Sequence, residues 1–349
     1  MTDTTLKERY TGCLLGGAVG DALGWPVEFS SIREIVRDYG KKGILDPPLG
    51  AAGVAEITDD TQMTLFTAEG LLSAWTSARQ SGNTPDFINA MRRSYGSWLI
   101  TQGEISPCLA EGERTGWLQD IAALHQRRAP GSTCLSALKE DSLSSDGIAR
   151  NTSKGCGGVM RAAPAGLLTP RIYQGSDQDA VRHAFELGRA AAALTHGHPS
   201  GYYPAGALAA IIATVVTGGT LLDGAKLSLK LLKNRSGSKE TSAAIKSALM
   251  LWENQDLPAS PDVISCMGEG WVGEEALAIG LYCALDAGDD FVRGVRLAVN
   301  HGGDSDSTGS ITGNILGALL GEKAIPSAWL ARLEVCDVIR KVGAELFEQ

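Results

Sequence analysis

Apolar residues along this chain recur mostly at the spacing of one helix face. Stretches rich in alanine and leucine place them three and four positions apart, which is the repeat expected of a helix. Such stretches cover residues 65–78, 180–194, 205–216, 274–287 and 291–299. Runs that alternate Val, Ile, Thr or aromatic residues with polar ones, as strands do, are scarce. The pattern predicts an all-α fold.

Two glycine-rich segments are expected to be helical despite the low helix propensity of glycine. Four glycines recur every four residues in each segment, which places them on one helix face. A face without side chains lets another backbone approach closely, so core packing is the simplest interpretation. Because each segment adjoins an acidic motif, we predict that the two helices pack together and bring both chain ends to the centre. The two sets are Gly12, Gly16, Gly20 and Gly24, and Gly309, Gly313, Gly317 and Gly321.

The polar loops contain no clear interdomain linker, and no internal repeat stands out. We therefore expect an N-terminal arm of residues 1–11 followed by one helical domain of residues 12–349. Hydrophobic residues make up 44% of the chain and charged residues 20%, which is ordinary for a globular protein. The formal net charge of −9 argues against a broad surface for nucleic acid. An acidic protein that binds a phosphorylated ligand needs metal ions or backbone N–H groups to offset the ligand's charge.

Cysteine usage and hydropathy indicate a cytoplasmic protein. The seven cysteines are scattered, without a CxxC pair or the spacing of a zinc site. An odd cysteine count without a secretory leader is typical of reduced thiols, and residues 1–10 lack the apolar core of a signal peptide. The longest uncharged apolar stretch, 205–222, is interrupted by Thr-Gly-Gly-Thr. It is expected to be a buried helix followed by a turn, so no membrane role is predicted.

The first acidic motif is Thr58-Asp59-Asp60-Thr61, immediately before an apolar run. Threonine and aspartate are common helix N-caps, and acidic residues are favoured in the first turn of a helix. Taken alone, the motif is therefore most simply interpreted as a helix cap.

The second acidic motif, residues 301–309, opens the second glycine-rich helix with the sequence HGGDSDSTG. A helix cap needs one oxygen ligand, whereas Asp304 and Asp306 with the neighbouring hydroxyls offer the oxygen groups that a hard cation such as Mg²⁺ prefers. An EF-hand would require glutamate where Ile315 stands. The Asp-x-Asp-x-Thr string also matches the nucleophile loop of haloacid-dehalogenase-like phosphatases. That loop follows a strand near the start of its domain, whereas this one follows a helical stretch near the chain end.

Two further segments could bind phosphate. Residues 151–161, NTSKGCGGVMR, are small enough to expose backbone N–H groups to an anion, although a tight turn explains them equally well. They lack the Gly-Lys-Ser/Thr ending of a Walker A loop. His196 and His198 could bind a metal, but no third soft ligand is evident. A hydrogen bond from His196 to phosphate or ribose is the favoured interpretation, and a structural role stays open.

Together these elements resemble the ADP-ribosylglycohydrolase family, which includes the dinitrogenase-reductase-activating glycohydrolases. The resemblance runs from about Gly12 to Gly321, nearly the whole chain. Any one motif is weak, but five in family order are specific. They are GCLLGGAVGDALG (12–24) followed by Glu28, TDDT (58–61), GCGGVMR (155–161), TH (195–196) and GGDSDST (302–308).

The resemblance implies a single orthogonal all-α domain and a hydrolase that removes ADP-ribose with two Mg²⁺ (or Mn²⁺) ions at its centre. Ser307 stands where many relatives have threonine and keeps the hydroxyl oxygen. Glu28 matches an acid beside the metals that serves catalysis or gating in some relatives, and we expect it to act with Asp60 and Asp304. His196 matches a histidine that contacts ribose or phosphate. The positions that match metal ligands are Thr58, Asp59, Asp60, Asp304, Asp306 and Ser307, and those in the diphosphate loop are Ser153, Gly155 and Gly157.

One departure from the family pattern affects the predicted substrate. Some arginine-specific relatives carry an aspartate in an Asp-Ile-Gly-x-x-Thr motif, and the best match here, residues 129–133, has Ala129 in the aspartate position. Acids of the preceding loop could substitute for it, which leaves the linkage and the general base open. These acids are Glu104, Glu111, Glu113 and Asp120.

The resemblance makes an ADP-ribosylated protein the expected substrate. Arginine-linked ADP-ribose is the first expectation, and serine-linked ADP-ribose or O-acetyl-ADP-ribose is the second. A non-catalytic ADP-ribose-binding protein, as in crystallin-like members of the family, is an alternative of another class. A cognate ADP-ribosyltransferase toxin is then a further expected partner. The intact acidic set argues against binding alone, and the two-metal interpretation requires Asp60 and Asp304 to lie close together.

Overall fold

The chain is built from helices throughout the residues that the computed structural model describes, which are 3–173, 175–254 and 256–349. Sixteen α-helices and five short 3-10 helices follow one another, and these ranges contain isolated bridges but no strand. The predicted all-α fold is confirmed.

The α-helices vary in length from one turn to six. They are α1 (Asp3–Gly24), α2 (Ile32–Tyr39), α3 (Asp59–Ser81), α4 (Phe87–Thr101), α5 (Ser132–Glu140), α6 (Ala163–Ile172), α7 (Asp177–Ala193), α8 (Pro199–Val216), α9 (Leu221–Leu232), α10 (Lys239–Glu253), α11 (Pro261–Ser265), α12 (Gly273–Ala287), α13 (Phe291–Val299), α14 (Ser305–Leu320), α15 (Ser327–Leu330) and α16 (Cys336–Phe347). The 3-10 helices are η1 (Trp25–Val27), η2 (Leu118–Asp120), η3 (Ala122–His125), η4 (Cys156–Gly158) and η5 (Glu322–Ala324).

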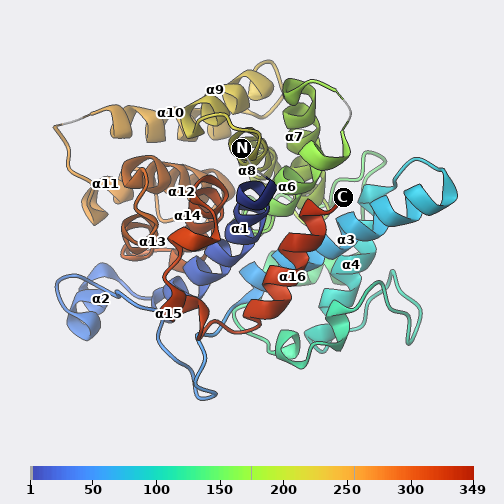
Figure 1. Cartoon of the computed structure of the whole chain (residues 1–349), viewed down its shortest axis with the longest axis horizontal. Helices are drawn as coiled ribbons and strands as arrows, with labels where there is room; N and C mark the ends of the chain where they lie inside the picture. The colour runs from blue at the N-terminus through green and yellow to red at the C-terminus, as the bar shows by residue number, and fades with distance from the viewer. Residues whose placement is uncertain (1–2, 174, 255) are drawn as a thin grey trace.

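Helices α1 and α14, from opposite ends of the chain, lie side by side at the centre of the molecule (Figure 1). They meet along their glycine faces. A Cβ atom added at Gly20 would lie 2.0 Å from the backbone oxygen of Gly309, and one at Gly317 would lie 1.9 Å from that of Gly12. No side chain fits at such distances, so glycine is what permits this close approach. The predicted pairing of the two glycine-rich helices is confirmed.

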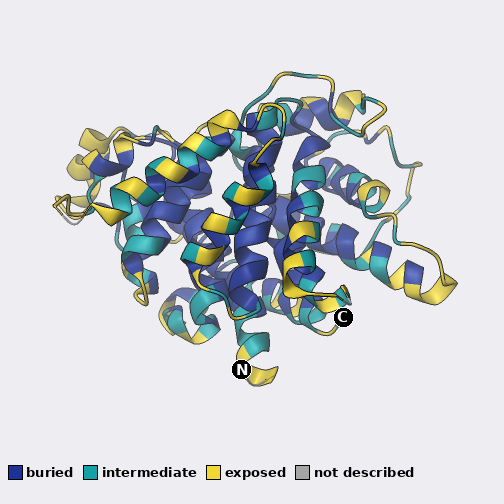
Figure 2. Ribbon diagram, turned by 90° about the horizontal axis from the view of Figure 1, so that it is seen from above, coloured by how far each residue is buried: buried dark blue, intermediate teal, exposed yellow. Residues whose placement is uncertain are grey.

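The remaining helices surround this pair and bury it. Figure 2 shows the inner helices almost wholly buried and the outer ones exposed along one side. Helix α8 is long and apolar enough to cross a membrane by length and composition alone, but 94% of it is buried inside the protein. It is therefore the buried helix that the sequence predicted, and residues 217–220 form the turn region after it.

The N-terminal residues join the central helix. Helix α1 begins at Asp3, so the described part of the expected arm continues without a break into the glycine-rich segment. Tyr10 is buried, with its ring 5.6 Å from that of Phe347 in α16. The boundary at residue 12 stays a prediction, and residues 1–2 lie outside the described ranges.

Three element ends meet at the centre and supply acidic side chains. The C-terminal end of α1 leads through η1 to Glu28. Helix α3 begins at Asp59, with Thr58 as its N-cap. Helix α14 begins at Ser305, directly after Asp304. The close packing of α1 on α14 therefore places Glu28 beside the acids of the C-terminal motif.

Candidate active site

The acids of both chain ends converge on one cavity. One carboxylate oxygen from each of Glu28, Asp304 and Asp306 lies within 4.8 Å of the others. The hydroxyl of Ser307 lies 3.4 Å from Oδ1 of Asp60 and so joins the two acidic motifs. Asp59, like these five residues, lines the same cavity. Asp60 and Asp304 thus line the same cavity, and the charge of Asp304 is among those that raise the pKa of Asp60.

The cavity has a volume of about 380 Å³, and three further segments form its wall. These are the loop at residues 129–133, the glycine-rich loop at residues 155–157 and a rim that includes Phe29 and Trp271. His196 and Met160 complete the inner wall. The cavity therefore joins a cluster of carboxylates to a glycine loop and a histidine.

Thr58 caps helix α3, as the simpler interpretation of the first motif predicted. Its hydroxyl accepts the N–H of Asp60 at 3.2 Å and donates to Asp21 at 2.9 Å. A hydroxyl oxygen has two lone pairs, and the cap bond uses one of them. Thr58 is not among the residues that line the cavity, so the cap is the role that the structure shows and its place among the metal ligands stays a prediction. The loop at residues 129–133 contributes the backbone N–H of Gly131, which donates to Oδ2 of Asp59 at 3.1 Å.

Asp21 is a site residue that the sequence reasoning missed. It is fully buried in α1, and its carboxylate accepts the backbone N–H groups of Thr58 (3.0 Å) and Thr61 (3.2 Å) as well as both threonine hydroxyls. These bonds hold the first turn of α3 and so orient Asp59 and Asp60. The available signal was a single acid within the otherwise apolar and glycine-rich stretch of residues 12–24.

Burial and mutual repulsion shift the pKa values of the clustered acids upward. Desolvation, followed by the charges of Asp306, Asp304 and Asp59, raises the pKa of Glu28 to about 10. Burial is also the main cause that raises the pKa of Asp60 and of Asp304 well above the usual range. Ionised carboxylates this close together repel one another unless a cation lies between them.

The donor set fits divalent cations. Among the described residues, three cavity carboxylates have a buried oxygen without a hydrogen-bond partner, namely Glu28 (Oε2), Asp60 (Oδ2) and Asp304 (Oδ2). A buried carboxylate oxygen without a partner is unfavourable. Several such oxygens from different helices, with no nitrogen or sulfur ligand in the group, match the coordination that Mg²⁺ and Mn²⁺ prefer.

The glycine-rich loop packs against Cys134 and His196, and at Gly157 no side chain fits. A Cβ atom at Gly157 would lie 2.8 Å from the sulfur of Cys134. The hydroxyl of Ser153 accepts the N–H of Gly155 at 3.2 Å and so fixes the turn. Gly157 lies within η4, where backbone N–H groups of the first turn have no partner inside the helix. The N–H groups of Gly155 and Cys156 are already bonded, to the Ser153 hydroxyl and to the carbonyl oxygen of Trp271, so the N–H of Gly157 is the donor that this part of the loop offers to an anion.

His196 is buried between Thr195 and the glycine loop. Burial, and then the charge of Arg161, lowers its pKa to about 3. Arg161 donates to the Thr195 hydroxyl at 2.6 Å, and that hydroxyl lies 2.8 Å from Nδ1 of His196. The other ring nitrogen, Nε2, faces the glycine loop, because a Cβ atom at Gly155 would lie 3.3 Å from it. His198 instead caps α8 through a bond from the N–H of Ser200.

Comparison with known proteins identifies the family. A family model described as ADP-ribosylglycohydrolase matches residues 2–349. The chain belongs to this family. Membership supports an enzyme that removes ADP-ribose by hydrolysis, with a modified protein as its substrate.

Relatives of this glycohydrolase match along most of their length. The ADP-ribosyl-[dinitrogen reductase] glycohydrolase of Rhodospirillum rubrum is 25% identical over 345 residues, which cover 96% of this chain and 93% of the relative. The ADP-ribosylarginine hydrolase Tri1 of Pseudomonas putida is 25% identical and is covered to 80%, with 100% of this chain matched. A solved structure described as an ADP-ribosylglycohydrolase-related protein complex is similar with a TM-score of 0.63 at 26% identity, covering 99% of each chain.

Ala129 of the glycohydrolase lines the cavity, two residues before the glycine that bonds to Asp59. The four acids of the preceding loop that could have replaced an aspartate at position 129 do not line the cavity. Three of them form ion pairs instead: Glu104 with Arg127 and Lys139, Glu113 with Arg93, and Asp120 with Arg114. The loop at 129–133 therefore approaches the acidic cluster without bringing a carboxylate of its own.

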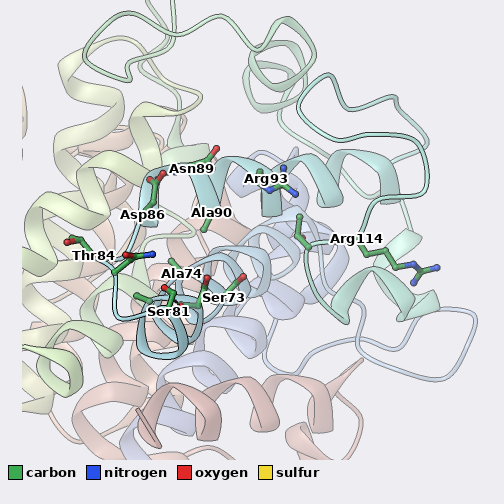
Figure 3. Close-up of a pocket in the computed structure, with 13 residues that line it drawn as sticks. Ser73, Ala74, Ser81, Thr84, Asp86, Asn89, Ala90, Arg93 and Arg114 are labelled. Carbon is green, nitrogen blue, oxygen red and sulfur yellow. Dashed lines mark hydrogen bonds between the residues drawn. The ribbon is translucent and has the colours of Figure 1, made fainter.

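A second cavity lies between α3 and α4, and Figure 3 shows its lining. It has a volume of about 430 Å³ and is lined mostly by small polar side chains. Its two arginines, Arg93 and Arg114, are engaged by acidic side chains. Its lining has neither an acidic cluster nor a glycine loop, so the candidate active site is the cavity at Glu28.

Proposed function

We propose that this glycohydrolase removes ADP-ribose from a modified protein side chain with the help of two Mg²⁺ (or Mn²⁺) ions. One observation carries the proposal. Carboxylate oxygens without a hydrogen-bond partner, from segments far apart in the sequence, meet in one cavity that a glycine loop also lines. The ions would be held by Thr58, Asp59, Asp60, Asp304, Asp306 and Ser307. When bound, such ions supply positive charge that binds and orients the ribose hydroxyls and lowers the pKa of coordinated water.

The part of the cavity wall formed by the glycine-rich loop supplies the proposed diphosphate site. Ser153, Gly155 and Gly157 shape this loop, and the backbone N–H of Gly157 is free to suit a phosphate oxygen. Nε2 of His196 lies beside them and is the proposed additional donor. Lys154 does not contribute its charge there, because its ammonium group is 2.7 Å from Glu240 in an ion pair. The anion is thus held by backbone and histidine donors together with the cations.

Glu28 is the acid best placed for the chemistry itself. It approaches from α1, apart from the two acidic motifs, and one of its oxygens has no partner among the described side chains. Cleavage at ribose C1′ builds positive charge on the sugar, which adjacent carboxylates stabilise. We assign to Glu28 the activation of water or assistance to the leaving group, and to Asp60 and Asp304 the holding of the ions that make this possible.

Arginine-linked ADP-ribose is the proposed linkage. A relative at 25% identity is named for ADP-ribosylarginine hydrolysis. Ala129 leaves one wall of the cavity without a carboxylate, which makes serine-linked ADP-ribose or O-acetyl-ADP-ribose the second candidate.

Release of ADP-ribose from matched protein substrates tests the function. Arginine-modified and serine-modified proteins are each incubated with the enzyme in Mg²⁺ or in EDTA, and free ADP-ribose is measured. We expect release from the arginine-linked protein in Mg²⁺ and loss of that release in EDTA. Release from the serine-linked protein alone would contradict the proposed linkage. Tight ADP-ribose binding without release from either protein would contradict hydrolysis and favour a binding role, such as blocking an ADP-ribosyltransferase toxin.

A further inference from the structure

A row of exposed apolar side chains begins at the active-site rim and continues along α2. Phe29 is 73% exposed, Ile32 37%, Val36 40% and Tyr39 40%. Ile32, Val36 and Tyr39 are four and three residues apart in α2 and therefore share one helix face. We call these four residues the α2 stripe.

The body of the protein does not cover the α2 stripe. Ile35 is the only buried side chain of α2, and Figure 1 shows this helix at the edge of the molecule. The helix has its own local stabilisation, a capping box in which Ser31 and Glu34 bond reciprocally. Formation of α2 therefore does not depend on burying the stripe.

Both ends of the α2 segment are fixed near the acidic loop of the C-terminal motif. Gly302 of that motif packs against the start of the helix, where a Cβ atom added at Gly302 would lie 3.2 Å from the backbone nitrogen of Ile32. After the helix, the side chain of Asn300 accepts the N–H of Ile44 at 2.8 Å and donates to its carbonyl oxygen at 2.9 Å. The stripe is thus held at a defined place relative to the active site.

The α2 stripe is continuous with the cavity mouth. Phe29 follows Glu28 directly and lines the cavity, as does Trp271. The two rings are stacked, with centroids 5.7 Å apart and planes at 16°. Trp271 is tied to the glycine loop, because its carbonyl oxygen accepts the N–H of Cys156 at 3.2 Å. The stacked pair therefore joins both walls of the cavity to the stripe.

We propose that the α2 stripe docks the polypeptide that flanks the ADP-ribosylated side chain. This inference rests on the proposed function. A modified side chain that reaches the carboxylates must leave its own backbone at the cavity mouth, where the stripe begins. Ile32 to Tyr39 span about 10 Å along the helix axis, at 1.5 Å per residue, which matches a short peptide segment. Four partly exposed side chains are too few for a stable dimer, which needs about 800 Å² per partner. The recognised chemistry is an apolar residue close to the modified one.

A double substitution that spares the cavity tests the docking. Val36→Ser with Tyr39→Ser removes half of the stripe and leaves Phe29 and Trp271 in place. Its matched control is Ile88→Ser with Met250→Ser, two exposed apolar residues on α4 and α10 that do not line the cavity. Each variant is assayed on an ADP-ribosylated protein and on the free ADP-ribosylated amino acid of the same linkage. We expect the stripe variant to raise KM for the protein about tenfold, with kcat and the rate on the amino acid unchanged.

The two substrates separate failure of docking from failure of the proposed function. An unchanged KM for the protein in an active stripe variant overturns the docking inference and leaves the function standing. Equal losses on both substrates also overturn it, because the stripe would then act on the cavity rather than on the polypeptide. If the unaltered enzyme cleaves neither substrate, the proposed function is contradicted, and this inference, which rests on it, is contradicted as well.

Discussion

At the scale of single residues, the arrangement of the site depends on buried hydrogen bonds that connect distant parts of the chain. Asp21 bonds to residues 37 and 40 positions further along, and through them it sets the start of α3. Local patterns identified Thr58 as a cap and Asp59 and Asp60 as first-turn acids. They could not reveal Asp21, because its partners come close only when α1 and α3 have packed.

Replacing Asp21 by asparagine should weaken cation binding without removing any proposed ligand. An amide nitrogen cannot accept the N–H and hydroxyl donors of Thr58 and Thr61, so the first turn of α3 loses part of its support. Groups that orient metal ligands typically contribute 10- to 100-fold in affinity, and we expect a loss of about tenfold for Mn²⁺ by calorimetry.

The matched control for this variant is Asp120→Asn, which changes an exposed acid paired with Arg114. Circular dichroism at the same temperature verifies that both proteins are folded. Unchanged Mn²⁺ affinity in a folded Asp21→Asn variant would contradict the orienting role.

At the scale of elements, glycine spacing was as informative as hydrophobic spacing. Residues 12–24 and 309–321 contain too much glycine to be predicted as helices from propensity, yet the four-residue repeat indicated two smooth faces that pack together. The physical reason is that an interface between two backbones leaves no room for side chains. The rim was not predictable in this way, because Trp271 is an isolated aromatic residue and becomes significant only through its stacking on Phe29.

Gly313→Ala should destabilise the protein strongly. The added Cβ atom would lie 2.0 Å from the carbonyl oxygen of Gly16, an atom of the facing helix backbone that cannot rotate away. Overpacking of this kind costs about 3 kcal/mol of unfolding free energy, which urea denaturation measures. Thr76→Ala, at an exposed position of α3, is the comparison and should change stability by less than about 0.5 kcal/mol. A Gly313→Ala protein as stable as that comparison would show that α1 and α14 can move apart freely.

At the scale of the whole molecule, the fold brings the two ends of the chain together to form the site. Glu28 and Asp304 are far apart in sequence, and the packing of α1 on α14 makes them neighbours. The motifs and their order predicted the fold, the acidic cluster and the place of the glycine loop. The fate of the acids at residues 104–120 could not be predicted, since only the folded chain shows that they do not line the cavity and that three of them form ion pairs.

The most direct test of the central claim is Mn²⁺ binding to the intact protein and to variants from each acidic motif. Electron paramagnetic resonance counts the bound ions in the unaltered protein, in Asp60→Asn and in Asp304→Asn. We predict two bound ions in the unaltered protein and weaker binding in both variants, because ligands from opposite chain ends share one site. Undiminished binding in both variants, or no binding in the unaltered protein, would contradict the account.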